Sequence, residues 1–178
     1  MSLQSLVITT LLPVNIPIQF IDKSSKSIEM PITWQIPTLI ILTLMFDRKV
    51  VFRAYTIYII LGLFISPVFN QGGSIGYLLT PNFGYLLGAY PLIKIIDNLN
   101  KRNKINIGNF LKNGILAISA LHLTGIFYNI LLIIFYSQFN LFLYNLGKYS
   151  LGKIGYHYLM LFPLLLLIKP IERLKRSK

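Results

Sequence analysis

Six apolar stretches separated by short polar segments run along the chain. They occupy residues 3–21, 31–46, 50–69, 77–96, 110–135 and 155–168. A membrane-spanning helix needs about 20 predominantly apolar residues, with a range of about 17–25. The third, fourth and fifth stretches have that length, the second and last need their flanks, and two prolines weaken the first. The pattern predicts an all-α integral membrane protein with six transmembrane helices, folded as one domain over residues 1–178.

Composition supports this interpretation. Hydrophobic residues make up 54% of the chain and charged residues only 12%, whereas a soluble domain has about 25% charged residues. The first stretch has neither a basic segment before it nor a small-residue cleavage site after it, which favours a span over a signal peptide. We therefore expect a multi-pass protein of the cell membrane.

The basic residues alternate between loops. Of the 17 lysines and arginines, 13 lie in or beside the second and fourth connections and the C-terminal tail, and four lie in the other connections. Because cytoplasmic loops accumulate Lys and Arg, both termini are predicted to be cytoplasmic. The net charge of +12 then reflects membrane topology and lipid contact, and we expect no nucleic-acid partner.

Catalytic and metal-binding motifs are missing from the sequence. None of the five acidic residues lies deep within a predicted span, and the two histidines, His122 and His157, lack the spacing of a metal motif. The glycine-rich segment contains no G-x-x-x-x-G-K-[ST] sequence, so another subunit would have to hydrolyse any ATP that drives transport. We expect no enzymatic activity and no cofactor.

Uncharged polar residues gather instead at the predicted outer side. Thr33 and Gln35 begin the second stretch, and the charge-free segment PVFNQGGSIGYLLTPNFGYLLGAY (67–90) carries Asn70, Ser74 and Tyr85. Such groups among apolar residues are typical of a small-molecule pocket, and the backbone amides of Gly72 and Gly73 could bind an anion. Loop capping and interfacial anchoring by tyrosine are the alternative roles of these residues.

Two segments resemble a known family. MPITWQ (30–35) is similar to the VP-[IV]-T-x-Q box, and LGLFISPVFNQGGSIGYLLTPNFGYLLGAY (61–90) is similar to the glycine-rich stretch, of the BioY family. These proteins are the biotin-binding S components of energy-coupling factor (ECF) transporters. The resemblance implies an S-component bundle that binds biotin from outside and works with a coupling subunit and two ATPase subunits. It also implies that Gln35 and Tyr85 contact the ligand and that Gly72, Gly73 and Ser74 lie over it.

The chain departs from the family pattern at four places, one of which is TPNFG (80–84) where the family has GPTGG. The glycine loop is one residue shorter, so Asn70 and Ser74 can be aligned in two ways. The P-G-D-x-x-K box at the start of the family's sixth helix can be aligned in two ways. One alignment puts Lys169 at the position of its lysine, and the other puts His157 at the position of its aspartate. The second gives the sixth helix a sensible length and is preferred. The first span lacks the A-x-x-x-A that faces the coupling subunit. These departures leave two alternatives to biotin uptake: binding of another small vitamin or a biotin precursor, and a membrane scaffold without a ligand.

Overall fold

The computed structural model describes residues 2–17, 27–70, 72–100, 105–136 and 139–176. Some of the charged residues on which the predicted topology depends lie outside the described residues, namely Asp22, Lys23, Lys26, Lys101, Arg102, Lys104 and Lys178. The first half of the chain forms α1 (Ser2–Leu11), β1 (Pro13–Pro17), β2 (Ser27–Thr33), α2 (Gln35–Met45), α3 (Arg48–Phe64) and the 3₁₀ helix η1 (Ile75–Leu79). The second half forms α4 (Pro81–Leu87), α5 (Ala89–Asn100), α6 (Ile107–Tyr136), α7 (Leu141–Leu146), the π-helical turn η2 (Gly147–Leu151), α8 (Gly152–Leu159) and α9 (Leu161–Arg176).

The prediction of helix alone is wrong for the first two apolar stretches. Helix α1 ends at Leu11 because Pro13 has no N–H to continue it, and the chain then pairs as an antiparallel hairpin. In this hairpin Pro13 lies opposite Thr33, and Ile16 lies opposite Ile28. The hairpin fills the space between α1 and α2, so these two helices stay short.

The fourth stretch is broken into three pieces, although its length predicts one helix. Gly88 lies between α4 and α5, at a point where a Cβ atom would overlap with the backbone of Leu121 in α6. A second close approach occurs at Gly84, whose missing side chain leaves room for Tyr128. Small residues allow helices to approach closely in membrane proteins, and here they bring α4 and α5 against α6.

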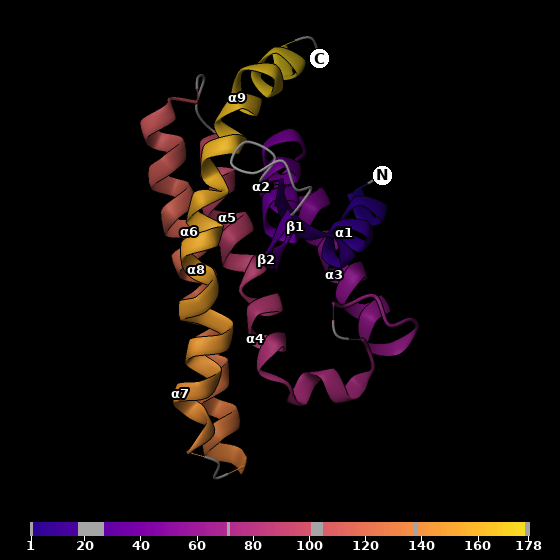
Figure 1. Cartoon of the computed structure of the whole chain (residues 1–178). Helices are drawn as coiled ribbons and strands as arrows, with labels where there is room; N and C mark the ends of the chain where they lie inside the picture. The colour runs from indigo at the N-terminus through magenta and orange to yellow at the C-terminus, as the bar shows by residue number, and fades with distance from the viewer. Residues whose placement is uncertain (1, 18–26, 71, 101–104, 137–138, 177–178) are drawn as a thin grey trace.

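The last helical segment starts earlier and ends later than the sequence predicts. Helices α7, η2, α8 and α9 follow one another, with a 44° bend between Leu159 and Leu161. Pro163 accounts for the bend, because its ring removes the N–H that would bond the carbonyl of Leu159. Figure 1 shows α6 beside this bent segment as a long column, with α1, the hairpin, α2 and α3 on the other side.

Among the described residues, one helix is long and apolar enough to cross a membrane unaided. It is α6, with 30 residues, and the bent pair Leu141–Leu159 and Leu161–Leu174 makes a second candidate. The other helices are shorter, because prolines, glycines and the hairpin interrupt the apolar stretches. Helix α1 and the C-terminal part of α9 both lie in the upper half of Figure 1.

Candidate ligand-binding site

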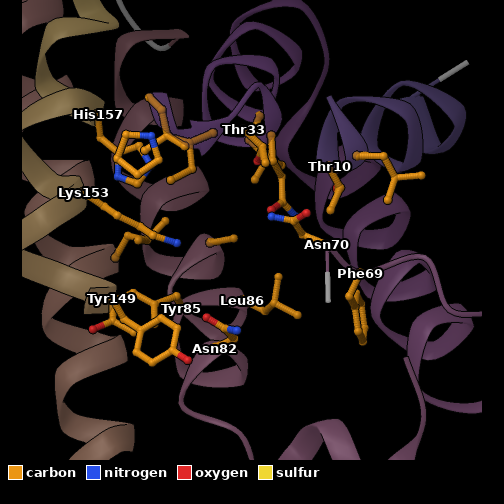
Figure 2. Close-up of a pocket in the computed structure, with 18 of the residues that line it drawn as sticks. Thr10, Thr33, Phe69, Asn70, Asn82, Tyr85, Leu86, Tyr149, Lys153 and His157 are labelled. Atoms are coloured by element: carbon orange, nitrogen blue, oxygen red, sulfur yellow. The ribbon is translucent and has the colours of Figure 1, made fainter. Parts of the chain in front are cut away.

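A cavity of about 520 Å³ lies between the hairpin side of the molecule and the long helical column. Its lining comes from α1, the hairpin, α2, α3, the loop after α3, η1, α4, α5, α6 and the last helical segment. The structure brings five of the eight predicted site residues to this cavity: Thr33, Gln35, Asn70, Tyr85 and His157. Figure 2 shows four of them, Thr33, Asn70, Tyr85 and His157, around the central space.

The junction of β2 and α2 positions Thr33 and Gln35. The strand ends at Thr33 and the helix begins at Gln35, and the backbone N–H of Trp34 between them donates to the carbonyl of Leu12 at 3.1 Å. This bond ties the junction to the end of α1. The amide nitrogen Nε2 of Gln35 is buried and makes no hydrogen bond of ordinary geometry within the described part of the chain, although the hydroxyl of Tyr58 lies near the Gln35 side chain.

Tyr85 enters the cavity from α4. Its ring packs against Gly125 of α6, where a Cβ atom would overlap with the ring, and the ring of His122 contacts it edge-on at 5.6 Å between centroids. Its hydroxyl oxygen is buried and, like Nε2 of Gln35, makes no hydrogen bond of ordinary geometry with the described residues, although the side chain of Ser150 lies near it. Buried polar atoms without such a bond are few in folded proteins, and the two residues that carry them both line this cavity.

The two histidines form a hydrogen-bonded chain between α6 and α8. Nδ1 of His122 lies 2.9 Å from Oγ of Ser150, and Nε2 of His122 lies 3.0 Å from Nδ1 of His157. Both rings are buried. His157 therefore reaches the cavity with Nδ1 already engaged and Nε2 as its remaining ring nitrogen. It lies well inside the last helical segment, not at its start, because that segment begins at Leu141.

Lys153 is a site residue that the sequence analysis missed. The last apolar stretch is predicted to begin at residue 155, which leaves Lys153 in the connection before it. The structure instead places Lys153 in α8, one turn before His157. Its side chain is half-buried and lines the cavity, and Figure 2 shows its nitrogen directed into the space. Among the described lining residues it alone carries a formal charge. The i, i+4 spacing from His157 is the sequence signal that would have found it, had the helix been extended toward Leu141.

Aromatic side chains and short polar contacts complete the wall. Tyr55 donates to the carbonyl of Leu86 at 2.9 Å, and the hydroxyls of Thr10 and Tyr58 lie 3.1 Å apart. Phe69 packs on Tyr77 with 4.6 Å between ring centroids. The wall therefore presents polar and apolar surface in similar amounts, which makes the cavity more polar than most small-molecule sites.

The glycine loop lies beside the cavity without lining it. Gly72, Gly73 and Ser74 are absent from the lining residues. Gly72 has a φ of +104° and pairs with Phe69 in a tight turn, a conformation that favours glycine. A Cβ atom on Gly73 would overlap with the backbone of Gly62 and Pro67. In this structure the glycines hold Phe69 and Asn70 against the cavity.

A comparison of the sequence with known families adds to this geometry. The sequence profile of the BioY family matches residues 2–162. The chain belongs to the BioY family. The resemblance of the two sequence segments is thereby confirmed, and family membership makes the chain a membrane protein of a transport family.

Two relatives of this BioY-family chain are informative. The "Probable biotin transporter BioY" of Lysinibacillus sphaericus is 41% identical over 59 residues, which is 33% of this chain and 30% of that protein. The crystal structure at 2.1 Å of the S-component for biotin from an ECF-type ABC transporter superposes with a TM-score of 0.64 and 18% identity, over 98% of this chain and 87% of that one. The structural match confirms an S-component-like fold.

Proposed function

We propose that this chain is the biotin-binding S component of an ECF transporter and captures biotin at the outer face of the cell membrane. The observation that carries the proposal is the cavity, which is lined by five predicted residues, two of which carry buried polar atoms that make no hydrogen bond of ordinary geometry. Its volume of about 520 Å³ falls within the range of about 300–1,000 Å³ that is typical of ligand pockets. The names of the two relatives indicate biotin as the ligand.

The cavity has groups for both ends of biotin. The ureido ring presents one carbonyl and two N–H groups, which match Nε2 of Gln35, the hydroxyl of Tyr85 and Nε2 of His157 as donors or acceptors. The valerate tail ends in a carboxylate, and Lys153 is the cation available to it. Since no described lining residue is acidic, the ammonium group has no carboxylate partner in the cavity until a ligand brings one.

We also propose six membrane crossings with both termini cytoplasmic. Support comes from the alternation of basic residues and from the order of the helical segments, in which the hairpin extends α1 and α2 and the pieces η1, α4 and α5 together make one crossing. Irregular backbone is tolerated at membrane depth where it is buried in protein or lines a cavity. The hairpin and the broken fourth segment both border the cavity, as this rule requires.

Energised uptake would require a coupling subunit and two ATPase subunits. We propose that α1 faces the coupling subunit, with Ser5 and Thr9 in place of the family's two alanines. The hydroxyl of Thr9 donates to the carbonyl of Ser5 at 2.6 Å, so its polar atom is turned onto its own helix. The exposed side chain of Ile8 would supply apolar contact on the same helix.

Equilibrium binding of biotin to the purified chain tests the proposal. A dissociation constant weaker than about 10 μM, equivalent to about 7 kcal/mol, would reject biotin as the ligand. Gln35→Ala and Tyr85→Phe should each weaken binding by about 1–3 kcal/mol, or roughly 5- to 150-fold. Gln4→Ala and Tyr156→Phe make the same changes at exposed positions outside the cavity and should leave the affinity unchanged.

A second measurement separates a binding role of Tyr85 from a structural one. Without ligand its hydroxyl is buried and makes no hydrogen bond of ordinary geometry, a state that costs free energy. Tyr85→Phe should therefore weaken biotin binding while leaving the ligand-free melting temperature equal or higher. A lower melting temperature together with unchanged affinity would show that the hydroxyl has a partner within the protein.

His157 supports a related candidate function, uptake of a biotin precursor or another small vitamin. A neutral imidazole can donate or accept a hydrogen bond, whereas the aspartate expected from the family pattern is an acceptor when ionised. Competition of biotin precursors and other small vitamins against labelled biotin distinguishes the two candidates. If a competitor binds more tightly than biotin, it replaces biotin in the proposal, and if nothing binds, the scaffold alternative is favoured.

A further inference from the structure

A second cleft, of about 470 Å³, lies at the N-terminal end of α3. Its lining, here called the basic cleft, consists of Arg48, Lys49, Phe52 and Arg53 of α3 and Lys94 of α5. None of these residues lines the ligand cavity. Four of the five carry a positive charge, and they come from two helices that are far apart in the sequence.

The positive charge of the basic cleft is only partly neutralised. Arg48 lies 3.8 Å from Asp97 of α5, and Asp47 is an exposed residue at the N-cap of α3. In the described part of the chain no ion pair involves Lys49, Arg53 or Lys94. Two carboxylates against four cations leave an excess of two positive charges around one cleft. Membrane topology by itself does not require these cations to gather in one place.

The position of these cations on α3 makes the excess positive charge energetically less favourable. The N-terminus of a helix carries partial positive charge, so cations there are destabilising and anions are stabilising. The first turn of α3 has no acidic residue. Lys49 and Arg53 are also four residues apart on one helix face, where like charges repel. A bound anion would relieve both effects at once.

An apolar surface continues from the basic cleft along α3. Beyond Arg53, the same helix face carries Ile57, Ile60 and Phe64, which are 48%, 46% and 65% exposed. Their spacing of three and four residues places them in one stripe. Within the cleft the ring of Phe52 is stacked on Tyr90 with 5.5 Å between centroids. A free phosphate ion needs no such stripe, whereas the acyl chains of a lipid would cover it.

We propose that the basic cleft binds the phosphate of an anionic phospholipid, with the acyl chains lying along the stripe formed by Ile57, Ile60 and Phe64. The clustered Lys and Arg side chains resemble the basic pockets that hold anionic headgroups at the cytoplasmic surface. The inference rests on the proposed topology, which places this end of α3 at the inner leaflet. It does not depend on biotin as the ligand.

Native mass spectrometry of the purified full chain, titrated with dioleoyl phosphatidylglycerol or dioleoyl phosphatidylcholine, tests the inference. The wild type should prefer the anionic lipid, and Arg53→Gln with Lys94→Gln should reduce that affinity about 30-fold. Lys169→Gln with Arg173→Gln removes the same charge from exposed positions of α9 and should have little effect. No lipid preference in the wild type, or equal losses in the two double variants, would overturn the inference.

Two further arms separate a lipid from a free anion and guard against misfolding. Inorganic phosphate and the short-chain dihexanoyl phosphatidylglycerol should compete poorly with the dioleoyl lipid, since they cannot cover the stripe. Effective competition by inorganic phosphate would make this a free-anion site and refute the lipid assignment. The single changes Arg53→Gln and Lys94→Gln, each checked by circular dichroism, give the same comparison if the double variant does not fold.

Discussion

Replacing Lys153 with methionine is the sharpest test of how the cavity recognises its ligand. The side chain is half-buried and is the one charged group among the described lining residues. In the proposed complex its ammonium group meets the biotin carboxylate. Methionine keeps most of the length and apolar surface of the lysine stem and removes the charge, so the variant isolates the electrostatic contact.

The expected loss follows from the surroundings of Lys153. Two unit charges about 4 Å apart interact by about 4 kcal/mol at an effective dielectric constant of about 20. Because the side chain is only half-buried, solvent screening reduces this value, and we expect a loss of about 2 kcal/mol, or roughly 30-fold in affinity. The ligand-free protein should lose no more than about 1 kcal/mol of stability, since the ammonium group gives up its position 5.7 Å from the ring centroid of Tyr149 but no described lining carboxylate loses a partner.

The assay compares two ligands on three proteins. Isothermal titration of wild type, Lys153→Met and Lys148→Met with biotin and with uncharged biotinamide gives the coupling between the side chain and the carboxylate. Lys148 is exposed and does not line the cavity, so its variant should behave as wild type. Lys153→Met should lose affinity for biotin but little for biotinamide. Equal losses for both ligands, or none for biotin, would refute the assignment of Lys153 to the carboxylate.

The packing around Tyr85 and the histidine pair provides two further predictions. A side chain at Gly125 would overlap with the ring of Tyr85, so Gly125→Ala should destabilise the protein by about 1–3 kcal/mol and weaken ligand binding. Gly147→Ala, where a Cβ atom meets nothing within 4 Å, is the control, and an unchanged melting temperature in Gly125→Ala would contradict the packing. His122→Ala should weaken binding through His157, which loses its partner at Nδ1, at a cost of about 1–3 kcal/mol. His122→Gln retains an amide that can bond Nδ1 and should restore most of the affinity, whereas equal affinity in the wild type and in both variants would show that His122 does not position His157.

The sequence determined the position of two long apolar helices and identified two of the polar residues that line the cavity. Length and apolarity were sufficient to predict α3 and α6, because a long apolar stretch in a membrane has few alternatives to a helix. Gln35 and Tyr85 were found through the two family segments, and both end at the cavity. Their local setting, a strand-to-helix junction and a short helix after a proline, is encoded within a few residues of each.

Only the tertiary structure decided the hairpin, the breaks in the fourth segment and the last helical segment, and the roles of Lys153 and His157. The hydrogen bond between His122 and His157 joins residues 35 positions apart, and the break at Gly88 depends on the approach of α6. Such features arise from contacts between distant segments, which leave no local pattern of apolar and polar positions. The sequence alone therefore places Lys153 in a loop, whereas the packing of α8 places its charged side chain at the cavity.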